Sequence, residues 1–163
     1  MFKIKLLTSL YKYFIFISLL CLSACNYYYL EDEYRQKFYV SPTTSLAGMQ
    51  LRNNLLVFFP NQDIKTAEYD ITTTLKTTES LFLTNRQGYA TQGKVDILVK
   101  CTIINMNDKS VMAVMNISYS NNYNVEISAH SNKMALTNAV DSLTKIIAKD
   151  IYMRVSMLMA KKS

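Results

Sequence analysis

The chain has 163 residues, and its 18 Lys and Arg against 12 Asp and Glu give a formal net charge of +6. Three of these basic residues, Lys3, Lys5 and Lys12, lie close to the amino end, and without them the charge is +3. This mildly basic balance, with no dense Lys or Arg run, excludes the charge pattern of a nucleic-acid-binding protein. The length suffices for one domain with its own core.

An apolar run from Phe14 to Leu22 follows the three lysines, and Leu22-Ser23-Ala24-Cys25 comes next. A basic start, a short apolar middle and a small-residue cleavage site are typical of a secretory signal peptide. The stretch is too short for a membrane-spanning helix, which needs about 20 apolar residues. A Cys directly after Leu-Ser-Ala also resembles a bacterial lipobox, in which the chain is cut before the Cys and the Cys carries the lipid.

We therefore predict a signal peptide over residues 1–24, a lipidated amino end and tether over 25–37, and one α+β domain over 38–163. The alternatives are an uncleaved helix and an ordinary signal peptide with a coincidental Cys. In enterobacterial lipoproteins an Asp directly after the lipidated Cys retains the protein at the inner membrane, so by resemblance Asn26 indicates the outer membrane. Tyr27-Tyr28-Tyr29 suits either the headgroup zone of a membrane or burial against the domain.

The first half of the domain alternates between strand and helix signals. A short strand is predicted at Phe38–Val40, and a helix over 46–59 follows Thr43-Thr44-Ser45, three hydroxyl residues that suit an N-cap. Pro60 ends this helix. Ala67–Leu75 alternates apolar and polar residues with many Thr, which predicts a half-buried strand that can continue to Leu83. Asn85–Gly93 is predicted to be a polar loop.

The second half predicts a β-hairpin and a long helix. Val95–Ile103 and Val111–Tyr119 alternate on either side of the turn residues Asn107-Asp108, and Asn121-Asn122 is expected to end the second strand. A helix of roughly 28 residues, capped by Ser128 or Ser131, then carries apolar residues at steps of three and four: Leu136, Val140, Leu143, Ile147, Ile151, Val155 and Leu158.

The predicted order is β-α-β-β-β-α. Strands with one apolar face and helices with one apolar face bury both when the helices cover one side of the sheet. We therefore expect an α+β fold with two helices packed on one face of a small, mainly antiparallel or mixed four-stranded sheet.

Nothing in the sequence predicts catalysis, a metal site or a cofactor. His130 is the only His, and it lies near a predicted helix start among polar residues. Cys101 falls on the apolar side of a strand, where a thiol behaves as a small hydrophobe, and it has no partner for an internal disulfide. Glu68 and Asp70 share a strand face that we expect to be solvated. We therefore predict that the protein is not an enzyme.

Basic residues on the predicted hairpin suggest a binding surface. Lys94 and Lys100 point to the side away from the core, and Arg86 and Lys109 flank the neighbouring loops. Such side chains can bind phosphate groups by charge. The alternative is that they are ordinary solvated surface residues.

The chain from Cys25 onward resembles one family, the lipopolysaccharide-assembly lipoprotein LptE in an alphaproteobacterial-like form. The resemblance rests on the order of the lipobox at Cys25, the helix with Leu51-Arg52-Asn53-Asn54-Leu55, the strand Ala67–Leu75, the hairpin at Asn107-Asp108, the Ser120–Asn124 link and a long helix with Ala139, Leu143, Ala148, Asp150 and Ile151. Gln92 departs from it, because relatives tend to have a basic residue near that position.

The resemblance implies an outer-membrane lipoprotein, anchored on the periplasmic side, that plugs and supports the β-barrel LptD and binds lipopolysaccharide. It implies Lys94, Lys100, Arg86 and Lys109 as candidates for the phosphates of lipid A, and the mild net charge predicts no nucleic-acid partner. The alternative function is that of an auxiliary lipoprotein for an ABC-type lipid transporter of the envelope.

Overall fold

A computed structural model describes residues 32–84, 86–125 and 128–161 of the chain. Its elements are α2 (Asp32–Arg35), β1 (Phe38–Val40), α3 (Leu46–Phe58), β2 (Tyr69–Thr84), β3 (Ala90–Asn105), β4 (Val111–Asn124) and α4 (Ala129–Ala160).

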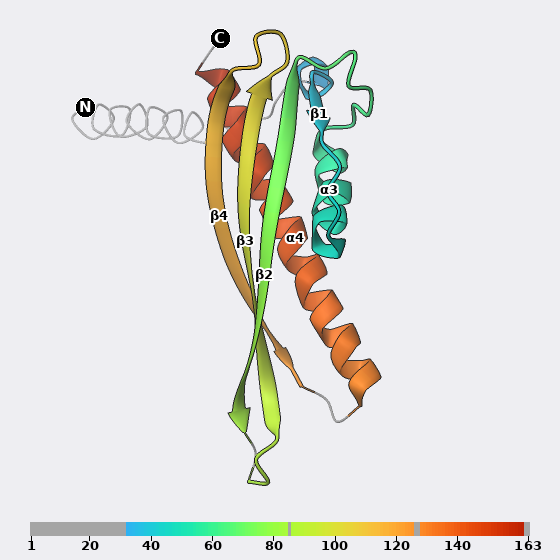
Figure 1. Cartoon of the computed structure of the whole chain (residues 1–163), viewed down its shortest axis with the longest axis vertical. Helices are drawn as coiled ribbons and strands as arrows, with labels where there is room; N and C mark the ends of the chain where they lie inside the picture. The colour runs from blue at the N-terminus through green and yellow to red at the C-terminus, as the bar shows by residue number, and fades with distance from the viewer. Residues whose placement is uncertain (1–31, 85, 126–127, 162–163) are drawn as a thin grey trace, which may run out of the picture.

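The four strands form one mixed sheet in the order β1-β2-β3-β4. β1 runs parallel to β2, and the other neighbours are antiparallel. Helices α3 and α4 lie side by side against one face (Figure 1). The predicted fold class, with its two helices on one face of the sheet, is confirmed.

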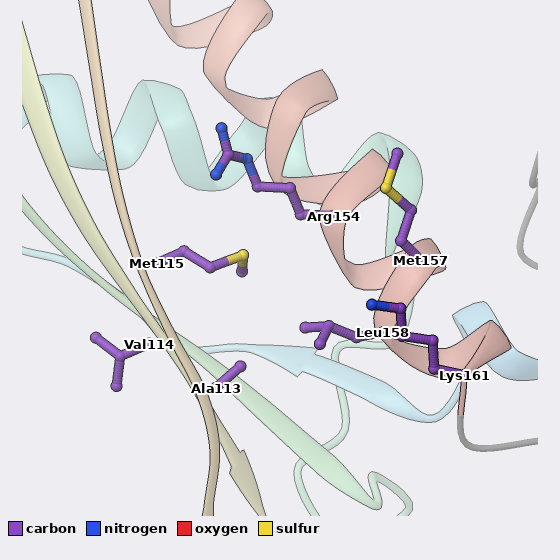
Figure 2. Close-up of a pocket in the computed structure, with 7 residues that line it drawn as sticks. All are labelled: Ala113, Val114, Met115, Arg154, Met157, Leu158 and Lys161. Carbon is purple, nitrogen blue, oxygen red and sulfur yellow. The ribbon is translucent and has the colours of Figure 1, made fainter.

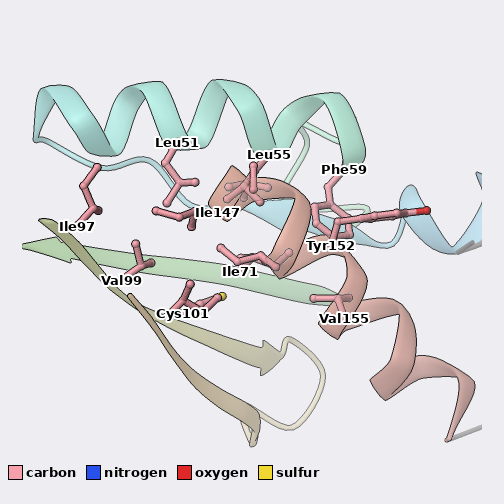
Figure 3. Packing of buried hydrophobic residues seen from close by; sticks show 14 of the residues in the cluster. Leu51, Leu55, Phe59, Ile71, Ile97, Val99, Cys101, Ile147, Tyr152 and Val155 are labelled. Carbon is pink, nitrogen blue, oxygen red and sulfur yellow. The ribbon is translucent and has the colours of Figure 1, made fainter. Parts of the chain in front are cut away.

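The alternation of side chains along the strands creates a core face and an outer face. Odd-numbered residues of β3 from Val95 to Ile103 are at most 2% exposed and contact the helices, whereas even-numbered residues point to the opposite side. Leu51 and Leu55 of α3 and Ile147 of α4 pack onto this core face (Figure 3). We call the helix-free side the outer face.

Specific residues begin and end the helices. Ser45 is the N-cap of α3 and accepts a hydrogen bond from the Gly48 N–H at 3.0 Å. Phe59 forms the C-cap, and Pro60 cannot continue the helix. Ser128, one of the two predicted candidates, is the N-cap of α4, which runs for 32 residues.

Two predicted boundaries are wrong. β3 begins at Ala90, so the loop ends earlier than Gly93, and β4 continues to Asn124 through Asn121 and Asn122. The reason is cross-strand pairing. Tyr123 lies across Gly93 and donates a hydrogen bond to Glu79 on β2, which outweighs the weak strand propensity of the two asparagines. The long β2–β3 hairpin therefore projects beyond α3 (Figure 1).

Residues 32–37 pack against the domain. The Arg35 side chain donates to the carbonyls of Phe58 at 2.7 Å and Val57 at 2.8 Å, which satisfies acceptors at the end of α3. Lys37 forms an ion pair with Glu68 at 3.2 Å. The predicted signal peptide, Cys25 and the first part of the tether lie outside the described residues. None of the helices in the described ranges is both long and apolar enough to cross a membrane.

Candidate functional site on the outer face of the sheet

The outer face carries mainly hydroxyl and amide side chains. They come from all three long strands and include Thr72, Thr74, Thr78, Ser80, Thr102, Asn116, Ser118, Ser120 and Asn122. Both large helices lie on the other side of the sheet (Figure 1). This polar surface is where the structure places two of the predicted basic residues.

Lys94 is on the outer face, but it forms an ion pair with a carboxylate. Its ammonium group lies 2.8 Å from Asp96 Oδ1, and the hydroxyl of Ser120 donates to the same oxygen. The hydrogen bond from Lys94, followed by that from Ser120, lowers the pKa of Asp96 below its usual range. The local charge of Lys94 is therefore largely compensated.

Lys100 has a different environment. It is exposed and stands directly opposite Thr74 on β2 and Asn116 on β4. Its two diagonal neighbours across the β2–β3 ladder are Thr72 and Lys76, and Lys76 stands opposite Leu98. Among the described residues, no carboxylate forms an ion pair with Lys76 or Lys100.

These five residues form what we call the lysine patch: Lys76, Lys100, Thr74, Asn116 and Leu98. Diagonal residues on neighbouring strands lie about 7–8 Å apart, which long side chains can span. Two ammonium groups can therefore converge on one phosphate, beside a hydroxyl and an amide. Leu98, 49% exposed, adds an apolar contact. This arrangement suits an anionic group carried by a partly apolar molecule.

The other predicted basic residues lie far from the patch. Lys94 is six residues from Lys100 along β3, a separation of about 20 Å. Arg86 belongs to the β2–β3 turn and Lys109 to the β3–β4 turn, so they lie at opposite ends of β3, about 50 Å apart. The structure therefore brings none of the other three to Lys100. The sequence analysis missed Lys76, because its neighbour is defined only by the register of β2 against β3.

Lys109 has a backbone role in its turn. Its φ of 58° is left-handed, and the flanking side chains of Asn105 and Asp108 accept bonds from the Asn107 and Ser110 N–H groups. These bonds confirm the predicted turn at Asn107-Asp108.

The residues weighed for catalysis are structural or solvated. Cys101 is completely buried, and burial raises its pKa to about 12, so at neutral pH it is a thiol and not a nucleophilic thiolate. His130 is exposed in the first turn of α4. Asp70 accepts hydrogen bonds from Ser41 and Thr72. Within the described residues, no three His, Cys, Asp or Glu side chains form a group that could hold a metal ion.

Comparisons with known proteins give a fold and no family. No family model matches the chain, and no curated protein sequence matches it. Several solved structures do match. A Caulobacter crescentus protein described as a lipoprotein is 11% identical with a TM-score of 0.68, and the match covers 80% of this chain and 96% of that one.

Rare lipoprotein B from Shewanella oneidensis is 12% identical with a TM-score of 0.55, over 77% of this chain and 94% of that one. Lipoprotein B from Nitrosomonas europaea is 12% identical with a TM-score of 0.58, over 81% and 92%. At these identities the likeness establishes a shared fold. The chain thus has, over most of its length, the fold of several bacterial lipoproteins.

Proposed function

We propose that this protein is an outer-membrane lipoprotein of the LptE type, which occupies an LptD-like β-barrel, supports its assembly and binds lipopolysaccharide. The observation that carries the proposal is the fold shared with rare lipoprotein B over 94% of that chain. The lipobox-like Leu22-Ser23-Ala24-Cys25 supports the same class, because it provides a lipid anchor for such a domain.

The surface of the domain is compatible with this role. One side of the sheet is covered by helices, and the other is a polar face. A compact domain of this kind can stand in the aqueous interior of a large barrel. A lipid at Cys25 confines it to the membrane surface, which raises its effective concentration beside a membrane partner.

Lipopolysaccharide carries phosphate groups on an apolar lipid, and the lysine patch offers both kinds of contact. Lys76 and Lys100 supply the charges, and Leu98 supplies the apolar surface. We assign phosphate binding to this pair, with Lys94 secondary because Asp96 compensates its charge.

Depletion of the protein in the bacterium that makes it tests this function. We expect less lipopolysaccharide at the cell surface and less correctly folded barrel, both restored by the wild-type chain. Expression of a Cys25→Ser chain in the depleted cells is the matched control for this restoration, because the variant lacks the predicted lipid site but keeps the domain. Fractionation of the wild type with the inner membrane, together with unchanged surface lipopolysaccharide, would instead favour an auxiliary role in a lipid transporter.

A further inference from the structure

The free edge of β4 exposes a regular series of backbone groups. The Val125 N–H donates to the carbonyl of Thr91, its opposite residue, at 3.0 Å, so this is a hydrogen-bonded pair. In an antiparallel ladder, hydrogen-bonded pairs alternate with pairs that are not hydrogen-bonded. Odd-numbered residues of β4 therefore bond β3, and even-numbered residues from Val114 to Asn124 direct their N–H and C=O groups outward. No strand in the described part of the chain pairs with that side.

The two free edges of the sheet differ in protection. Beyond Ile71, β2 is also an edge, and it carries the charges of Lys76 and Glu79. The 14 residues of β4, Val111–Asn124, include no charged residue and no Pro. Charges and Pro are the usual devices that keep an edge from pairing with another strand. Of the two edges, β4 is the one that can accept a strand.

A groove of about 290 Å³ adjoins this edge, between β4 and the end of α4. Met115 reaches from β4 toward α4, and Leu158 reaches back toward the strand (Figure 2). Met157, 53% exposed, adds a flexible apolar surface. A strand added beside β4 would place alternate side chains over this groove.

The rim of the groove is basic. Arg154 binds Asp150 through two bonds of 2.9 and 3.1 Å, and the nearby Lys161 has no ion pair with a described carboxylate. Lys161 therefore favours a carboxylate on whatever occupies the groove. A second copy pairing through the same edge is a poor match, because β4 has no acidic residue to offer.

We propose that the β4 edge and its groove bind an extended segment of another protein as a fifth strand, with apolar side chains over Met115 and Leu158 and an acidic side chain near Lys161. Main-chain hydrogen bonds would supply affinity, and the groove would supply selectivity. This inference goes beyond the proposed function and does not depend on it.

A peptide titration on the full protein, purified in detergent micelles, tests the proposal. The probe is a fluorescein-labelled ten-residue peptide that alternates Val or Leu with Thr and Glu, and its counterpart has Lys for each Glu. We expect the acidic peptide to bind at least tenfold more tightly, and the amides of β4, but not those of β2, to gain protection from hydrogen exchange.

A matched pair of proline substitutions tests whether binding uses the β4 edge. Ser118→Pro removes an outward N–H of β4 and should weaken binding at least tenfold. Thr77→Pro is the matched control, because it removes an outward N–H of β2. The Met106 N–H donates to the Glu68 carbonyl, so even-numbered residues of β2 bond β3 and the backbone groups of odd-numbered residues point outward. This variant should change binding less than twofold. If Ser118→Pro fails to fold, Lys161→Glu replaces it, with Lys149→Glu on the same helix as its control.

Three results would overturn the proposal: equal affinity for the two peptides, binding that both edge variants retain, or a dimer that Ser118→Pro dissolves, since that dimer would make a second copy the occupant. None of these measurements uses lipopolysaccharide or a barrel, so their failure would leave the proposed function untouched.

Discussion

Tyr123 joins three strands in the part of the sheet that α3 does not cover. Its ring occupies the space above Gly93, where an added Cβ would lie 2.3 Å from the ring carbon Cζ, and its hydroxyl donates to Glu79. The residue is only 9% exposed. Burial, with a further contribution from Glu79, raises the pKa of Tyr123 to about 12.

This pKa predicts a loss of stability in alkali. An unfolded Tyr has a pKa of about 10, so between pH 10 and 12 the unfolded chain releases a proton that the native protein keeps. The stabilisation is complete below pH 10 and declines as the pH rises toward 12. Near pH 11 the free energy of unfolding should have fallen by about 1 kcal/mol from this group alone.

Tyr123→Phe tests the effect. The variant keeps the ring but loses the hydrogen bond to Glu79, and we expect it to be about 1 kcal/mol less stable at pH 8. At pH 11 the difference in the free energy of unfolding between the two proteins should vanish, because only the wild type is destabilised by the ionisation of Tyr123. Cys101 is present in both proteins, so its contribution to the pH dependence cancels in this difference. Urea unfolding at the two pH values measures this, and a difference that stays constant would contradict it.

The lysine patch gives a second prediction. Lys76→Glu with Lys100→Glu should reduce lipopolysaccharide affinity about tenfold or more, because two charge-assisted contacts are lost. Lys133→Glu with Lys149→Glu makes the same charge change on exposed positions of α4 and should have little effect. Binding to immobilised lipopolysaccharide at fixed salt measures both. Equal losses in the two doubles would indicate a general effect of net charge.

Among the elements, periodicity predicts faces well and neighbours poorly. The alternation around Val95–Ile103 predicted the core side of β3 correctly, because side-chain direction in a strand depends only on parity. Pairing register depends on contacts between distant residues. For that reason the sequence did not reveal that Lys76 is diagonal to Lys100, or that Tyr123 extends β4 past Asn121 and Asn122.

Helix caps show the same division between local and distant information. Both N-caps, Ser45 and Ser128, follow from local side-chain chemistry and were among the predicted candidates. Their geometry differs, however, since the bond that Ser45 accepts is 3.0 Å long and the one that Ser128 accepts is 3.5 Å long. Only the structure separates a strong cap from a weak one.

This difference predicts unequal effects on stability. Ser45→Ala should lower the free energy of unfolding by about 1 kcal/mol, because the Gly48 N–H loses its partner. Ser128→Ala should cost less than half as much, because its bond is long and exposed. Thermal melts of the two variants measure this, with a shift of about 4 °C for Ser45→Ala. Equal shifts would show that bond length does not set the contribution of these caps.

The whole molecule has a one-sided plan. Its helices and core lie on one face of the sheet, while the outer face is polar and carries the lysine patch. The described residues begin at Asp32, seven positions after the predicted lipid site at Cys25. A lipid at Cys25, as proposed, would hold such a domain close to a membrane and leave its outer face open.

Isolation of the protein from detergent-solubilised outer membranes tests the central claim most directly. With an affinity tag at the carboxyl end, we expect one large β-barrel to co-purify in equal amount, and mass spectrometry to find acyl chains on Cys25. A chain that is recovered from the periplasm without a barrel, with an unmodified thiol at Cys25, would contradict the account.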